Sequence, residues 1–224
     1  MRRILCYGDS NTFGQNPQGG PRFDEIIRYP RALARLLGAG YEVIEEGFPG
    51  RTTVYETFVD PWVNGRTYLY PCVASHLPLD LVVLMLGTND LSVGVGVNAF
   101  YAAAGIQRLI RLIRQASQEW QQPCPEILVV SPPLIAKSSN STMVGNVFPF
   151  PAAHEESKRF RAEYAAVAES EHCAFLAAED YTETGPDGVH MTAESHLRLA
   201  RALADSIEIQ LRQKTEEQNE SSIC

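Results

Sequence analysis

The sequence predicts a doubly wound α/β fold, in which one parallel sheet lies between two layers of helices. First, short apolar segments alternate along the 224-residue chain with longer segments of helical periodicity. Second, these short segments are nearly continuous in Val, Ile and Leu, which is typical of strands buried on both faces. We therefore expect five parallel strands, at residues 4–7, 41–45, 81–86, 126–130 and 174–177.

Four longer segments have the spacing of amphipathic helices that would cover the sheet, at residues 29–37, 98–120, 153–172 and 193–212. The first has Pro30 in its first turn and Gly38 after its last turn, as helix ends favour. The second repeats its apolar side chains at i, i+3, i+4 and i+7 from Ile106 onward. Residues 52–75 and 137–151 have no clear assignment, and their aromatic side chains favour an ordered lid or a subunit contact.

Length and composition favour one domain over residues 1–213, followed by a flexible tail at 214–224. The net charge of -8 and the lack of a basic stripe argue against nucleic-acid binding. No apolar run is long enough for a membrane span. The chain leads directly into its first strand without a signal peptide, and its five cysteines are scattered, so we expect a cytoplasmic location. We see no CxxC or Cys/His ligand spacing and expect no metal or cofactor.

Polar turns follow the first three predicted strands and the fifth. They are the segments Gly-Asp-Ser-Asn at 8–11, a glycine-rich turn at 46–52, Gly-Thr-Asn-Asp at 87–90 and Asp-Gly-Val-His at 187–190. In a doubly wound sheet these turns meet at the carboxyl edge, where ligands bind. The sequence therefore brings a serine, a histidine and a carboxylate to one crevice, which is the composition of an acyl-transfer site.

Three of these residues fit nucleophilic catalysis. A serine hydroxyl such as that of Ser10 becomes a nucleophile when an imidazole takes its proton, and His190 is the candidate base. Asp187 stands three residues earlier, so one turn of chain brings its carboxylate to the imidazole. The carboxylate would select the imidazole tautomer and stabilise the imidazolium.

An oxyanion needs N–H donors, and we expect them from the Ser10 backbone, the Gly50 backbone and the Asn89 side chain. Asn11 and Val189 are neighbours of the nucleophile and the base in sequence, and we expect them to contact the substrate. Alone, Gly50 is more often a turn glycine, Asn89 a turn or cap residue, and His190 a surface or core histidine. Their arrangement after different strands favours a catalytic site.

Two aspartates and the remaining histidines have no catalytic context in the sequence. We interpret Asp9 and Asp90 as loop-bracing residues, because aspartate side chains bond to nearby backbone in turns. His76 precedes a strand and His196 falls within a predicted helix, so we interpret both as structural.

The four turns, in this order, resemble the sequence blocks of the SGNH hydrolases, the GDSL-type esterases, from about residue 4 to residue 203. The resemblance implies a flavodoxin-like sheet and a triad of Ser10, Asp187 and His190. It also implies an oxyanion hole of Ser10, Gly50 and Asn89. Segments such as ILCYGDSNTFG and LVVLMLGTNDL are similar to the bacterial arylesterase and acyltransferase branch. That branch implies short acyl groups on small-molecule esters, acyl transfer or perhydrolysis beside hydrolysis, and a homo-oligomer.

Other functions remain open from the sequence. A carbohydrate O-acetyl esterase is the main alternative, followed by a thioesterase or lysophospholipase. A metal phosphoesterase would need more carboxylate and histidine ligands at the strand ends. A non-catalytic binding module on the same fold is a remote alternative. The α/β-hydrolases are disfavoured, because the turn at 8–12 lacks the second glycine of the GxSxG elbow.

Overall fold

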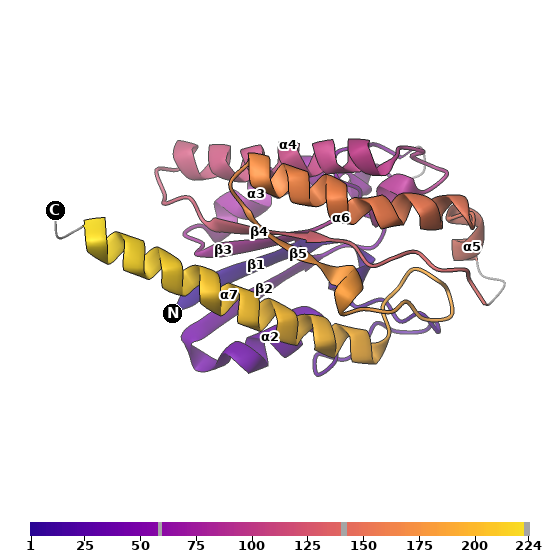
Figure 1. The fold of residues 1–224 in the computed structure, drawn as a ribbon, viewed down its shortest axis with the longest axis horizontal. Coiled ribbons are helices and arrows are strands. Elements are labelled where there is room, and N and C mark those ends of the chain that lie inside the picture. The colour runs from indigo at the N-terminus through magenta and orange to yellow at the C-terminus, as the bar shows by residue number, and fades with distance from the viewer. Residues whose placement is uncertain (58–59, 140–142, 222–224) are drawn as a thin grey trace.

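A computed structural model describes residues 1–57, 60–139 and 143–221 of the chain. A five-stranded parallel sheet runs through its centre in the order β2-β1-β3-β4-β5 (Figure 1). The strands are β1 (Arg2–Gly8), β2 (Tyr41–Gly47), β3 (Leu81–Met85), β4 (Glu126–Ser131) and β5 (Ala174–Ala177). Each overlaps a predicted strand, and the predicted doubly wound α/β class is confirmed.

Helices cover both faces of the sheet (Figure 1). One layer holds α3 (Gly65–His76), α4 (Ala99–Glu119) and α6 (Ala152–Ser170), and the other holds α2 (Tyr29–Leu37) and α7 (Ala193–Ser221). Shorter elements complete the chain: α1 (Ser10–Phe13), α5 (Met143–Val147), and the 3₁₀ turns η1 (Gly38–Gly40), η2 (Pro61–Val63), η3 (Thr88–Leu91) and η4 (Ala178–Asp180).

The central strands bury side chains on both faces, which explains their continuous apolar sequence. In β1, Leu5 and Tyr7 pack in the core beneath α3, α4 and α6, whereas Ile4 and Cys6 pack in the core beside α2 and α7. The apolar stripe of α4 is fully buried, and each such side chain contributes about 1.5–3 kcal/mol through burial. Two cores thus hold the sheet rigid between its helices.

The order of strands places one functional edge. After β1 the chain turns outward to β2, and it then returns past β1 to build β3, β4 and β5. The connections that leave the neighbouring strands β1 and β3 therefore run in opposite directions along the sheet. Open α/β sheets bind ligands at this point.

The two unassigned stretches contain helices that the sequence analysis did not predict. Helix α3 lies in the first and α5 in the second. Phe148 packs into the protein's own core at 7% exposure, whereas Trp62 is 76% exposed. Helix α7 also continues past its predicted end at residue 212. The single domain with a flexible tail stays a prediction, and residues 58–59, 140–142 and 222–224 lie outside the described chain.

Candidate active site

The candidate nucleophile opens a one-turn helix at the end of the central strand. Ser10 is the first residue of α1, and its backbone N–H has no partner inside that helix. The Asp9 carboxylate caps α1 by accepting the Asn11 N–H at 2.9 Å. Gly8 permits this sharp turn, because a Cβ there would lie 1.9 Å from the Thr12 hydroxyl. The local sequence thus holds Ser10 at the carboxyl edge of the sheet.

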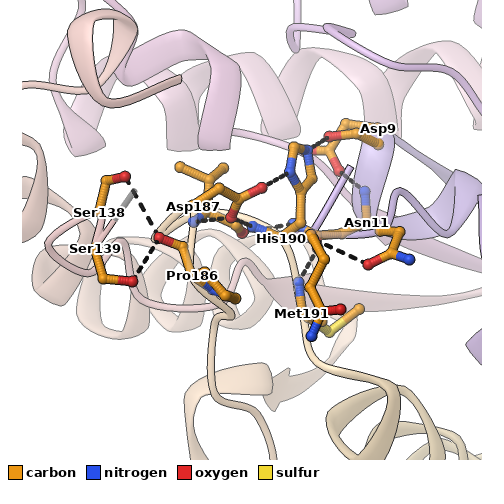
Figure 2. Close-up of polar contacts among 12 residues, drawn as sticks. Asp9, Asn11, Ser138, Ser139, Pro186, Asp187, His190 and Met191 are labelled. Carbon is orange, nitrogen blue, oxygen red and sulfur yellow. Dashed lines mark hydrogen bonds and ion pairs between the residues drawn. The ribbon is translucent and has the colours of Figure 1, made fainter. Parts of the chain in front are cut away.

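The candidate triad residues meet at hydrogen-bond distance. Nε2 of His190 lies 2.9 Å from Oγ of Ser10, across 180 residues of chain. Nδ1 of His190 lies 2.6 Å from Oδ2 of Asp187 (Figure 2). The carboxylate accepts from Nδ1–H, so the lone pair of Nε2 faces the serine hydroxyl. This arrangement can remove the hydroxyl proton as Ser10 attacks a carbonyl.

The Asp187 carboxylate is held by its own loop. Its Oδ1 accepts the backbone N–H groups of Val189 and His190, each at 2.9 Å. Burial raises the pKa of Asp187, but the hydrogen bond and charge of His190 outweigh it, and the net pKa lies below the usual value. Asp187 is therefore ionised at neutral pH and stabilises a protonated His190.

A second loop, which follows β4, supports the acid and base. The Ala136 N–H donates to the Gly188 carbonyl at 2.7 Å. The Ser139 N–H donates to the Pro186 carbonyl at 2.8 Å, and the hydroxyls of Ser138 and Ser139 approach the same oxygen (Figure 2). Motif spacing gave no signal for these contacts, because they join backbone groups of distant loops.

Two of the candidate oxyanion donors, Gly50 and Asn89, lie in the turns after β2 and β3, which a hydrogen bond joins. Gly50 has a φ of 80°, a conformation that glycine adopts without strain. Its N–H has no acceptor among the described residues. The Asn89 side chain donates to the Arg51 carbonyl at 3.0 Å, which joins η3 to the Gly50 turn. That amide nitrogen has two N–H donors, and the Arg51 carbonyl is its one acceptor among the described residues.

Asp90 braces the same two turns, as the sequence suggested. It accepts the Thr53 N–H at 3.0 Å and also bonds the Thr53 hydroxyl. Burial raises the pKa of Asp90 to about 7, although the Thr53 hydrogen bonds act in the opposite direction. Burial likewise raises the pKa of Asp9 to about 6. Thr53 therefore supports the candidate site. It was not predicted, because nothing in the turn at 46–52 or in the turn at 87–90 indicates that Thr53 bonds to Asp90.

Asn11 and Val189 are both buried, at 1% and 4% exposure. The Asn11 side chain donates to the Val189 carbonyl at 3.3 Å and accepts the Met191 N–H at 2.9 Å (Figure 2). It therefore bridges the nucleophile helix to the two neighbours of His190. The expected contact of Asn11 and Val189 with a substrate stays a prediction.

Arg51 is a further supporting residue that no motif indicated. Its guanidinium is buried over the Tyr7 ring at 4.3 Å. It donates to the Gly8 carbonyl at 2.9 Å and to the Glu46 carbonyl. The side chain thus ties the Gly50 turn to the end of β1, directly before the candidate nucleophile.

Two other observations concern the chain outside the candidate site. Among the described residues, Glu46, Cys72 and His76 form a cluster of three metal-type ligands, and none of them is a candidate triad residue or oxyanion donor. Within the same residues, no helix is both long and apolar enough to cross a membrane.

The chain is similar to one protein family and to several solved structures. The model of the GDSL-like lipase/acylhydrolase family matches residues 6–198. Est24, a carbohydrate acetylesterase from Sinorhizobium meliloti, is 37% identical with a TM-score of 0.88, over 94% of this chain and 100% of that chain. The native aryl esterase of M. smegmatis is 36% identical with a TM-score of 0.86, over 93% and 99%. A search of curated proteins found no match.

The family match spans most of the chain, and the solved esterases are covered almost completely. The resemblance found in the sequence blocks is confirmed. This chain therefore belongs to the GDSL-like lipase/acylhydrolase family within the SGNH hydrolases, and it is a carboxylic ester hydrolase.

Proposed function

We propose that the protein is a serine esterase that removes short acyl groups, with acetyl as the preferred group, through an acyl-enzyme on Ser10. The observation that carries this proposal is the continuous chain of contacts from Oγ of Ser10 through His190 to Asp187, at 2.9 and 2.6 Å. Support for the acetyl group comes from Est24, which is a carbohydrate acetylesterase.

In the first half-reaction, His190 takes the hydroxyl proton as Ser10 attacks the ester carbonyl. The developing oxyanion is bound by the N–H groups of Ser10 and Gly50 and by the Asn89 amide. His190 then gives its proton to the departing alcohol. Asp187 stays ionised throughout and stabilises the imidazolium.

In the second half-reaction, a water molecule gives its proton to His190 and attacks the acyl-enzyme. The acid is released, and Ser10 regains its proton. An alcohol or a peroxide in place of water would give a new ester or a peracid by the same steps. The protein would then act as an acyltransferase or perhydrolase.

A series of p-nitrophenyl esters from acetate to octanoate tests the acyl preference. We expect kcat/KM to be highest for acetate and to fall with chain length. A maximum at octanoate would reject the short-chain proposal and favour a lipase or lysophospholipase. Adding alcohols or hydrogen peroxide to the acetate reaction then measures transfer against hydrolysis.

A second candidate, a carbohydrate O-acetyl esterase, is favoured by the 37% identity to Est24. It uses the same residues and differs in the alcohol that leaves. Acetate release from acetylated sugars, at a kcat/KM above that for p-nitrophenyl acetate, would establish it. A kcat/KM far below that for the aryl ester would support an arylesterase instead.

A further inference from the structure

Three potential metal ligands meet between β2 and α3, outside the candidate triad. They are the carboxylate of Glu46, the thiol of Cys72 and the imidazole of His76. One atom from each lies within 4.8 Å of the other two. The closest pair is Nε2 of His76 and Oε1 of Glu46, at 3.2 Å.

The fold explains why these three side chains converge. Cys72 and His76 are four residues apart in α3, so both lie on one face of that helix. Glu46 lies near the end of β2, where it pairs in register with Tyr7. The pair lies partly in residues 52–75, for which the sequence predicted no helix, and α3 brings the two side chains to one face. The expectation of no metal stays a prediction.

The chemistry of this set fits a zinc-type ion. Thiolate, imidazole and carboxylate are the protein ligands of Zn²⁺, and three of them leave one position for water. Bond lengths of about 2.0–2.3 Å place tetrahedral ligand atoms about 3.3–3.7 Å apart. Without an ion, Glu46 and His76 are hydrogen-bonded at 3.2 Å, just below that range, and the Cys72 sulfur lies within 4.8 Å of both ligand atoms. A carboxylate and a thiolate together balance the charge of a divalent cation.

Two of the three side chains are partly exposed, Cys72 is buried, and Glu46 has an outer partner. Glu46 and Tyr68 line a surface hollow of about 530 Å³, and the side chains of Glu46 and His76 are 20% and 28% exposed. The Tyr68 hydroxyl lies 3.4 Å from Oε1 of Glu46, where it can orient the carboxylate. Burial and the charge of Glu46 raise the pKa of the Cys72 thiol, so the thiol keeps its proton until a metal ion displaces it.

We propose that Glu46, Cys72 and His76 form a binding site for one zinc-type divalent ion. As the ion binds, the Cys72 thiol releases its proton to solvent and the sulfur becomes a thiolate ligand. The bound ion links β2 to α3 directly before the turn that carries Gly50. This proposal does not depend on the esterase reaction, because none of the three side chains belongs to the candidate triad or oxyanion donors.

Titration of the metal-free, full-length protein with Co²⁺ tests the site, because a cobalt–thiolate bond has a charge-transfer absorption that other ligands lack. We expect this absorption to saturate at one equivalent and to disappear when Zn²⁺ is added. Cys72→Ser should abolish it, and His76→Gln should weaken Co²⁺ binding by about 100-fold or more. Cys124→Ser, which changes an exposed cysteine, should leave it unchanged.

Three results would overturn the proposal. One is the lack of a charge-transfer band in the wild type, which would leave a hydrogen-bonded cluster only. Another is a band that persists in Cys72→Ser or disappears in Cys124→Ser, which would place the metal elsewhere. The third is an unchanged Co²⁺ affinity in His76→Gln, a variant that keeps all cysteines and decides the question even where Cys72→Ser fails to fold.

Discussion

Asn11 links the candidate nucleophile to the candidate base from both sides. It follows Ser10, and its buried amide bonds the backbone of Val189 and Met191 on either side of His190. Asn11→Leu keeps the size of the side chain and removes both bonds. We expect kcat for p-nitrophenyl acetate to fall about 10- to 100-fold with little change in KM, because the imidazole is no longer held against Ser10.

The same variant separates positioning from substrate contact. A raised KM with unchanged kcat would contradict positioning and favour the substrate contact predicted from sequence. Proton NMR gives a second readout through the Nδ1 proton shared by His190 and Asp187. We expect that resonance to broaden in Asn11→Leu while the remaining spectrum stays that of the folded protein.

Asn89 has two functions in the proposed site. Its amide donates to the Arg51 carbonyl at 3.0 Å, and its second N–H is the candidate oxyanion donor. Asn89→Ala should lower kcat about 10²- to 10³-fold, because it removes a donor that acts most strongly in the transition state. Steady-state kinetics on p-nitrophenyl acetate measure the effect. A change below threefold would exclude Asn89 as an oxyanion donor.

The loop that carries Asp187 and His190 depends on close backbone packing at Gly188. This residue has a φ of 78°, and a Cβ there would lie 2.4 Å from the Ala136 carbonyl oxygen. Gly188→Ala should therefore displace the loop and lower kcat by at least about 10-fold. Gly19→Ala is the matched control, because Gly19 has a φ of 86° with open space around it.

Comparison of these two glycine variants separates backbone strain from loop displacement. Both introduce a left-handed alanine, at about 1–2 kcal/mol of unfolding free energy. Only Gly188→Ala also forces two loops apart. Equal activities in the two variants, measured with p-nitrophenyl acetate, would show that packing against Ala136 does not position the triad.

The sequence predicted the sheet well and one helix layer less well. Short apolar runs identified all five strands, most clearly β3 and β4, which are buried on both faces and nearly continuous in Val, Ile and Leu. Helix α3 was missed, although Leu69, Cys72 and Val73 form a helical stripe, because Pro71 interrupts it. Contacts between distant loops, such as those of Thr53 and Ala136, join backbone or single side chains and have no motif. The predicted triad residues, in contrast, belong to turns with a recognisable order.

His196 makes the stability of the whole molecule depend on pH. It belongs to α7 and is fully buried, and its Nδ1 accepts the N–H of Tyr29, the first residue of α2, at 3.3 Å. Burial lowers the pKa of His196 to about 3. In the unfolded chain the imidazole takes up a proton near pH 6.5, whereas in the folded protein it stays neutral. Its contribution is therefore complete above about pH 6.5 and is lost as the pH falls.

Denaturant unfolding of wild type and His196→Asn across pH 4.5–8 measures this contribution. Asparagine can keep the acceptor for Tyr29 and cannot be protonated. We expect the wild type to lose up to about 1.4 kcal/mol of unfolding free energy per pH unit relative to the variant below pH 6. A constant difference at all pH values would contradict the burial of a neutral His196.

The expected homo-oligomer is a further prediction about the whole molecule. Trp62, Phe100 and Tyr101 are large side chains that are more than half exposed. Phe148, in the second stretch expected to form a lid or a subunit contact, is instead buried in the core. Exposed aromatic side chains of this kind are typical of interfaces. Light scattering at micromolar concentration should give a mass above that of one 24.8 kDa chain, and a monomer would reject the prediction.

The most direct test of the central claim, that Ser10 is the nucleophile, is to label the nucleophile covalently with diethyl p-nitrophenyl phosphate. We expect one equivalent of p-nitrophenol, a mass gain of one diethylphosphoryl group on the peptide that contains Ser10, and loss of esterase activity. Ser10→Ala should take up no label and should lose about 10⁴- to 10⁶-fold in p-nitrophenyl acetate turnover. Label on another residue, or turnover that persists in Ser10→Ala, would contradict the assignment of Ser10 as the nucleophile.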